Sequence, residues 1–156
     1  MKKAVPFLVP CDSPDIPAIL ELLHQSFAYM EPRIMPRSSL HSLTIETISE
    51  FCVSNEIWTI GEPPKACVFL KEHHDCLYLG KLAVDGKARK CGYARQLVEL
   101  AEERAVFKNL PALEVEIRIE LIENHEAFRR LGFVKTSEGA HDGFDRITYI
   151  VMRKEV

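Results

Sequence analysis

Hydrophobic and polar positions alternate with two different periods along the chain, and these periods predict strands and helices in turn. The segment 112–121, ALEVEIRIEL, places a charged residue at almost every second position, which is typical of a strand with one face in water. Other strands are marked by short apolar runs bounded by turn residues such as GEPP and HHD. The segments predicted as strands are 5–9, 57–60, 66–72, 76–84, 112–121, 133–139 and 146–154.

Apolar residues spaced three and four apart predict helices between these strands. Asp12 or Ser13 is expected to cap the first helix, with Pro14 at its first position, and Ser38 or Ser39 to start the second. The helical segments are 14–27, 39–52, 92–105 and 124–132. The order is therefore β-α-α-β-β-β-α-β-α-β-β, which predicts one α/β domain over residues 1–156 with a mixed sheet.

Length and charge narrow the function classes. A chain of 156 residues fits one domain, and a net charge of −3 with a pI near 6.1 argues against nucleic acid as a partner. No apolar run reaches the roughly 20 residues that a membrane span needs, so no membrane partner is expected. Pro6 and Pro10 interrupt the short apolar start, which argues against a signal peptide and favours a cytoplasmic protein.

The cysteine and histidine pattern gives no sign of a metal site. The five cysteines are widely spaced and form no C-x-x-C motif, so reduced thiols are expected rather than a disulfide framework or a zinc site. The stretch EHHDC at 72–76 resembles a ligand cluster, but adjacent ligands in one turn rarely complete a tetrahedral site. We interpret it as a polar hairpin tip.

The stretch LAVDGKARKCGYARQLVELAEERA, residues 82–105, is the strongest candidate for a binding site. A strand leads into a turn and then a helix, whose first N–H groups have no internal acceptor and carry partial positive charge. Lys87, Arg89 and Lys90 add charge to this anion site, while Gly92 and Ala94 permit close approach. Both the P-loop pattern and G-x-G-x-x-G are absent, so another phosphate-bearing ligand is expected; the alternative is an exposed structural turn.

Two motifs in this chain resemble those of the GCN5-related N-acetyltransferases. Arg89, Gly92 and Ala94 match the family's acyl-CoA-binding pattern [RQ]-x-x-G-x-[GA], which follows a strand end like LAV at 82–84. Many members carry Gly directly after the Arg, where this chain has Lys90. The later segment ENHEAFRRLGF at 123–133 is similar to the family's second motif, and the element order also agrees. The resemblance implies a mixed, mostly antiparallel sheet of about seven strands with a splayed parallel pair and flanking helices.

The resemblance also implies where acetyl-CoA would bind as co-substrate. It would lie between the strands at 76–84 and 112–121, with its pantetheine arm against the backbone of the first strand. Asn124 is expected either to bond the cofactor or to cap its helix, two readings that stay open. The residues implied in cofactor binding are Leu82, Ala83, Val84, Arg89, Lys90, Cys91, Gly92, Tyr93, Ala94, Asn124 and Phe128.

The implied reaction is direct attack on the thioester by a primary amine of a small molecule or an amino-acid-like acceptor. The amine must lose a proton, and Glu120 and His141 are the candidate bases. Phe128 stands where many members have a Tyr that serves as the acid, so no acid is assigned. That departure favours an alternative, a non-catalytic acyl-CoA-binding module or sensor. The resemblance leaves open whether the protein is a monomer or a homodimer.

Overall fold

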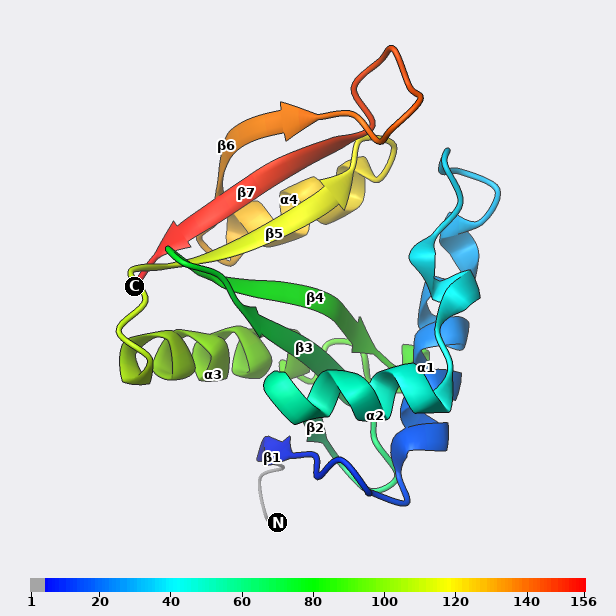
Figure 1. Ribbon diagram of the computed structural model, residues 1–156, viewed down its shortest axis with the longest axis vertical. Helices are drawn as coiled ribbons and strands as arrows, with labels where there is room; N and C mark the ends of the chain where they lie inside the picture. Colours follow the sequence, from blue (N-terminus) through cyan, green and yellow to red (C-terminus); the bar gives the residue numbers. More distant parts are fainter. Residues whose placement is uncertain (1–4) are drawn as a thin grey trace.

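Seven strands form one mixed sheet in the computed structural model, which describes residues 5–156 (Figure 1). The strand order is β1-β2-β3-β4-β5-β7-β6, and every neighbouring pair is antiparallel except β4 and β5. The strands are β1 Phe7–Leu8, β2 Glu56–Ile60, β3 Ala66–Glu72, β4 Leu77–Val84, β5 Ala112–Arg118, β6 Val134–Gly139 and β7 Tyr149–Glu155. The predicted fold class and element order are confirmed.

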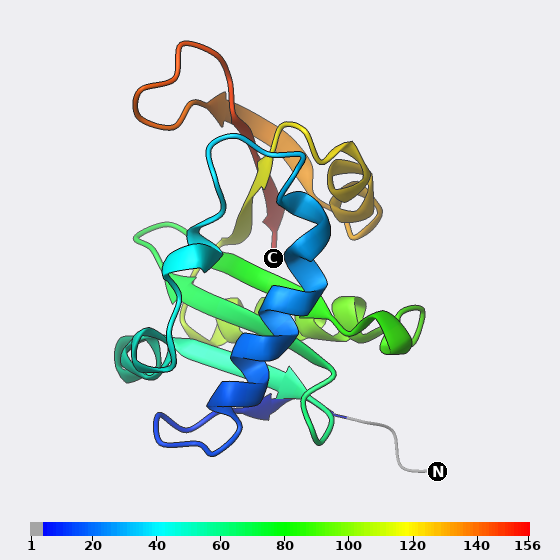
Figure 2. The ribbon, with the colours of Figure 1, turned by 90° about the vertical axis from the view of Figure 1, so that its right-hand side faces the viewer.

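Helices cover the two faces of the sheet, with α1 on the side opposite α3 (Figure 2). The α-helices are α1 Ile16–Phe27, α2 Ile45–Ser54, α3 Tyr93–Phe107 and α4 Ile122–Arg130. Short 3₁₀ helices occur at Ala28–Met30, Ser39–Ser42 and Gly86–Ala88. None of the helices in residues 5–156 combines the length and apolar character that crossing a bilayer requires.

Successive residues of β3 point to opposite faces, and this alternation builds two cores. Val68 and Leu70 pack in the cluster that α3 closes through Leu97 and Ala101. Cys67 and Phe69 pack instead in a second cluster, under α1 and α2. Burial on both faces explains why this strand reads as a continuous apolar run in the sequence.

The parallel pair β4 and β5 separates along its length. The two strands pair only at Leu77 with Leu113 and at Tyr78 with Glu114. Beyond Tyr78 they diverge, and Figure 1 shows the gap widening toward the carboxyl ends of both strands. The predicted splayed pair is therefore present.

Both N-terminal helices start later than the sequence analysis predicts. Asp15 is the N-cap of α1, and the Ser13 hydroxyl accepts from the Asp15 N–H in the turn before it. Ser38 caps only the 3₁₀ helix, while α2 begins after Thr44, which forms a reciprocal capping box with Thr47. The predicted caps are thus wrong by a few residues, because polar residues near a proline stabilise turns as readily as helix starts.

Candidate active site

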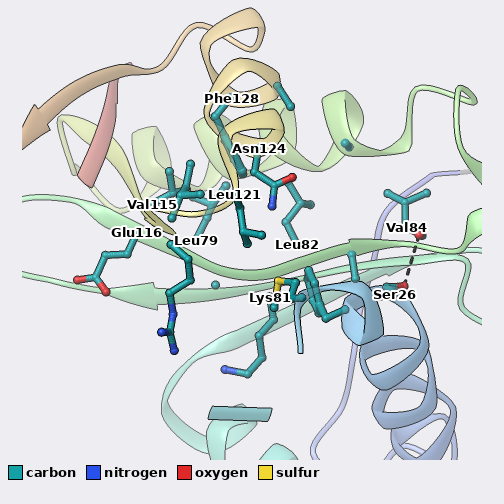
Figure 3. A pocket seen from close by; sticks show the side chains of 18 of the residues that line it. Ser26, Leu79, Lys81, Leu82, Val84, Val115, Glu116, Leu121, Asn124 and Phe128 are labelled. Carbon is teal, nitrogen blue, oxygen red and sulfur yellow. Dashed lines mark hydrogen bonds between the residues drawn. The ribbon is translucent and has the colours of Figure 1, made fainter. Parts of the chain in front are cut away.

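A cleft of about 940 Å³ opens where β4 and β5 separate (Figure 3). Side chains from α1, α3, α4 and the loop before β7 complete its walls. The structure brings most of the predicted site residues to this cleft, namely Leu82, Ala83, Val84, Arg89, Lys90, Gly92, Tyr93, Ala94, Asn124, Phe128 and His141. Cys91 and Glu120 do not line it.

Beyond Tyr78, no strand within residues 5–156 pairs with the edge of β4 that faces β5. Its backbone groups are therefore available to an extended ligand, in the way that an added strand completes a sheet edge. The side chains of Leu82 and Val84 pack toward α3, while Ala83 is buried on the α1 side. The carbonyl of Val84 also accepts a hydrogen bond from the Ser26 hydroxyl at 3.4 Å (Figure 3).

The mouth of α3 forms the second wall of the cleft. Gly92 is the N-cap, with φ +81° and open space where a side chain would stand, so a ligand can approach the backbone closely. The first N–H groups of this 15-residue helix point out of the helix without an internal acceptor. The N–H of Cys91, in contrast, donates to the Ala88 carbonyl at 3.4 Å. Cys91 therefore contributes neither a free N–H nor a wall to the cleft.

Lys90 adopts a left-handed conformation, with φ +70°. This is the position at which the resembled family often has Gly, a residue that accepts this conformation without steric cost. The departure at Lys90 changes the side chain without changing the turn, because the backbone still adopts the geometry that Gly favours.

Positive charge dominates the cleft. Among the residues of 5–156 that line it, Glu116 is the only carboxylate. Arg95 of α3 and Arg130 of α4 belong to the lining, and the sequence analysis did not include them. Such a cleft suits a polyanionic ligand.

Residues 5–156 contain no group of His, Cys, Asp or Glu side chains arranged to hold a metal ion.

Asn124 and Phe128 lie one turn apart on α4 and both face the cleft (Figure 3). The Asn124 side chain does not cap its helix; its Nδ2 donates to the phenolic oxygen of Tyr29 at 3.1 Å. The Phe128 ring packs edge-on against Phe133, with centroids 5.3 Å apart. Tyr29, from the segment after α1, is thus brought to Asn124, one helical turn before the position where the family often has a tyrosine, and no local signal in the sequence indicates this placement.

His141 lines the other side of the cleft, on the loop before β7. Its ring Nδ1 hydrogen-bonds the buried Thr148 hydroxyl, which also accepts from the His141 backbone N–H at 2.8 Å. The ring stands edge-on to Tyr149, with centroids 5.3 Å apart. Burial, and then the charge of Arg118, lower the pKa of His141, which favours the neutral imidazole.

Glu120 serves a different contact. Its Oε2 accepts from the Met35 N–H at 3.3 Å and lies 3.9 Å from Arg146 Nη1. Arg118 binds the same loop, donating from Nη1 to the Pro36 carbonyl at 2.7 Å. The end of β5 therefore holds the loop after α1 against the cleft, and Glu120 is part of that attachment.

Several solved structures of acetyltransferases share this fold over most or all of their length. A GNAT family acetyltransferase from Elizabethkingia anophelis with acetyl-CoA bound aligns over 100% of both chains, with a TM-score of 0.70 and 16% identity. An acetyltransferase from Streptococcus agalactiae aligns over 100% of both chains, with a TM-score of 0.77 and 14% identity. The ribosomal-protein-S18-alanine N-acetyltransferase from Escherichia coli aligns over 97% of this chain and 94% of its own, with a TM-score of 0.67 and 16% identity. The chain has no significant match among curated proteins.

The sequence profile of the Acetyltransferase (GNAT) family matches residues 16–133. This match spans α1 to the end of α4, and so includes the splayed strands and the mouth of α3. The protein belongs to the GNAT family of acetyltransferases.

Proposed function

We propose that this protein transfers an acetyl group from acetyl-CoA to a primary amine of a small molecule or amino-acid-like acceptor. The observation that carries the proposal is the cleft between β4 and β5, which ends at the helix mouth around Gly92. Family membership supports the acyl transfer, and a relative of the same fold has been solved with acetyl-CoA bound.

The residues present fit acetyl-CoA. The open space over Gly92 and the outward N–H groups of α3 suit a diphosphate, and Arg89, Lys90, Arg95 and Arg130 supply compensating charge. The unpartnered edge of β4 suits the amide groups of a pantetheine arm, which would use backbone groups of the segment 82–84. When bound, acetyl-CoA supplies an activated acyl group as a thioester.

His141 is the better of the two predicted bases. It lines the cleft, and its lowered pKa leaves the imidazole neutral and able to accept a proton near pH 7. In the tautomer in which Nδ1–H donates to Thr148, Nε2 carries the free lone pair. Glu120 lies outside the lining and binds the Met35 N–H, which suits positioning of the loop rather than proton transfer.

Tyr29 is the group that we propose as the acid for the departing thiolate. Phe128 has no proton to give, but the phenolic oxygen of Tyr29 lies 3.1 Å from Nδ2 of Asn124, one helical turn from Phe128. By accepting this hydrogen bond, the phenol is oriented on the cleft side of α4 with its own proton still available.

The second candidate function is a non-catalytic acyl-CoA-binding module, which the loss of the family's tyrosine at Phe128 favours. Release of free thiol from acetyl-CoA, measured across a panel of amines, separates the two. The proposed function predicts release that depends on both the amine and its concentration, with the acetylated amine identified by mass spectrometry. Binding of acetyl-CoA without thiol release for any amine would support the module instead.

A further inference from the structure

Lys81 occupies an irregular position on β4, inside the cleft. The register of β3 with β4 shifts between Cys67–Ala83 and Phe69–Gly80, so that Lys81 and Leu82 together oppose the single residue Val68. This is a β-bulge, and it changes the direction of the side chains next to it. Lys81 has φ +51°, a left-handed conformation that is rare for a residue with a side chain.

The bulge directs the Lys81 side chain away from the face on which α3 and α4 lie. Figure 3 shows Lys81 on the opposite side of β4 from Leu82, Asn124 and Phe128. Its Nζ lies 5.5 Å from the ring centroid of Phe69, a residue of the core under α1 and α2. The amine of this lining residue therefore lies on the α1 and α2 side of the sheet.

No carboxylate among residues 5–156 neutralises Lys81. The aromatic face of Phe69 stabilises its charge, and burial lowers the pKa of the amine. Arg118, another cation of the lining, differs from Lys81 in this respect, because it donates to the carbonyls of Pro36 and Arg37 and the charges of Glu120 and Glu116 favour its ionised form. Among residues 5–156, Lys81 is therefore a lining cation that forms no ion pair with a carboxylate of the protein.

We propose that Lys81 binds a carboxylate of the acceptor, so that the preferred acceptors are amino-acid-like molecules carrying both an amine and a carboxylate. This inference rests on the proposed acetyl transfer and specifies its substrate class. A simple amine is protonated when it enters the cleft, and the partly buried Lys81 cation would repel it. A carboxylate on the same molecule offsets that repulsion and forms a charge-assisted hydrogen bond with Nζ.

The test compares kinetics for a panel of α- and ω-amino acids with those for their carboxamides, which keep the amine and lose the carboxylate charge. The wild-type protein is expected to show a lower KM for each accepted amino acid than for its carboxamide. In Lys81→Met, which keeps a straight side chain of similar length, KM for the amino acid should rise about tenfold to a hundredfold, the equivalent of one hydrogen bond to a charged group. Its KM for the carboxamide, and its affinity for acetyl-CoA, should stay within about twofold.

Two further variants make the result specific. Lys81→Arg keeps the charge and should retain the preference for carboxylates, whereas Lys71→Met, at the exposed end of β3, should behave as wild type. Thermal unfolding of each variant checks that the fold is intact.

The outcomes separate this inference from the proposed function. Transfer to amines with equal KM for amino acids and carboxamides, or an unchanged preference in Lys81→Met, would overturn the carboxylate role and leave the acetyl transfer standing. A fall in kcat for every acceptor alike would also overturn it, because Lys81 would then act in the chemistry rather than in recognition. Absence of transfer to any amine would overturn the proposed function and this inference together.

Discussion

The Nδ2 atom of Asn124 lies 3.1 Å from the phenolic oxygen of Tyr29, which joins α4 to the segment after α1 across 95 positions of the chain. Asn124 and Phe128 share one face of α4, so this contact places a phenol near the aromatic position of the family's second motif. The contact therefore connects α4, in the part of the cleft proposed for acetyl-CoA, with the segment that follows α1.

Tyr29→Phe should lower kcat by about tenfold to a hundredfold if the phenol protonates the thiolate, since general acids contribute factors of that order or more. Binding of acetyl-CoA should change little, because the ring remains. Pre-steady-state measurement of thiol release gives the rate of the chemical step. A matched substitution, Tyr78→Phe, removes a different phenol that lines the cleft and has no proposed role in binding or catalysis, so it should be close to wild type. Equal rates for Tyr29→Phe and wild type would mean that the thiolate leaves unaided.

The protonation of His141 should control the acid limb of the plot of kcat/KM against pH. Its pKa is lowered from the ordinary value of 6.5, so the neutral base persists below that pH and activity should fall only at a lower pH still. His141→Gln should lower kcat/KM by about a hundredfold and abolish this limb. Dividing the wild-type profile by that of the variant removes the titration of the acceptor amine, which both share.

Glu120→Gln is the companion to that experiment. The amide can still accept from the Met35 N–H, so kcat should stay within about twofold of wild type while KM for the acceptor rises modestly. A loss in Glu120→Gln as large as in His141→Gln, with the acid limb gone, would reassign the base to Glu120.

Lys90→Gly should stabilise the fold, because the backbone at this position has φ +70° and a side chain there costs about 1 kcal/mol. Thermal unfolding should show a Tm higher by about 2–4 °C, the shift that 1 kcal/mol produces in a domain of this size. Lys87→Gly removes the same charge from the neighbouring 3₁₀ helix, where φ is not positive, and should lower Tm instead. A lower Tm in both variants would show that the left-handed turn carries no strain.

Glu56 should make stability depend on pH in the acid range. Burial opposes its ionisation, but hydrogen bonds from Arg104, Trp58 and Lys108 outweigh burial and lower its pKa from 4.5 to about 2. Because the folded pKa is below the unfolded one, this contribution is complete above pH 4.5 and is lost as pH falls toward 2. Glu56→Gln should cost about 1–2 kcal/mol at pH 7, as expected for a part-buried ion pair with solvent screening.

Denaturant unfolding of wild type and Glu56→Gln at several pH values measures this difference. The gap between the two proteins should narrow from pH 5 to pH 2.5. A gap that stays constant over this range would contradict the assignment of the shift to Glu56.

The order of elements could be predicted from the sequence because it depends on local signals. The alternation in 112–118 and the helical spacing from Ala94 to Ala105 are visible in any short window, and both elements are present. Boundaries were predicted less well where several turn signals compete. β5 ends at Arg118 rather than Leu121, because the chain turns there and the Leu121 N–H bonds the Arg118 carbonyl.

The candidate site also has one wall that the sequence predicts and one that it does not. The wall built from β4, its turn and α3 is one continuous stretch, so a motif identifies it. The opposite wall joins residues that are distant in sequence, such as Arg118 with the loop at Pro36, and no local pattern indicates those contacts. The bulge at Lys81 could not be predicted either. The run CLYLGKLAV has the pattern of an ordinary strand, and the bulge is defined only by its pairing with β3.

Isothermal titration with acetyl-CoA tests the central claim, that the space between β4 and β5 binds this co-substrate, most directly. Wild type should bind one equivalent with a dissociation constant on the order of 1–100 µM, and Arg89→Glu should bind at least about tenfold more weakly through charge reversal at the diphosphate. Lys71→Glu, at an exposed position that is not part of the cleft lining, should bind like wild type. No binding by the wild-type protein at millimolar acetyl-CoA would contradict the claim, and an unchanged affinity in Arg89→Glu would remove the mouth of α3 from the site.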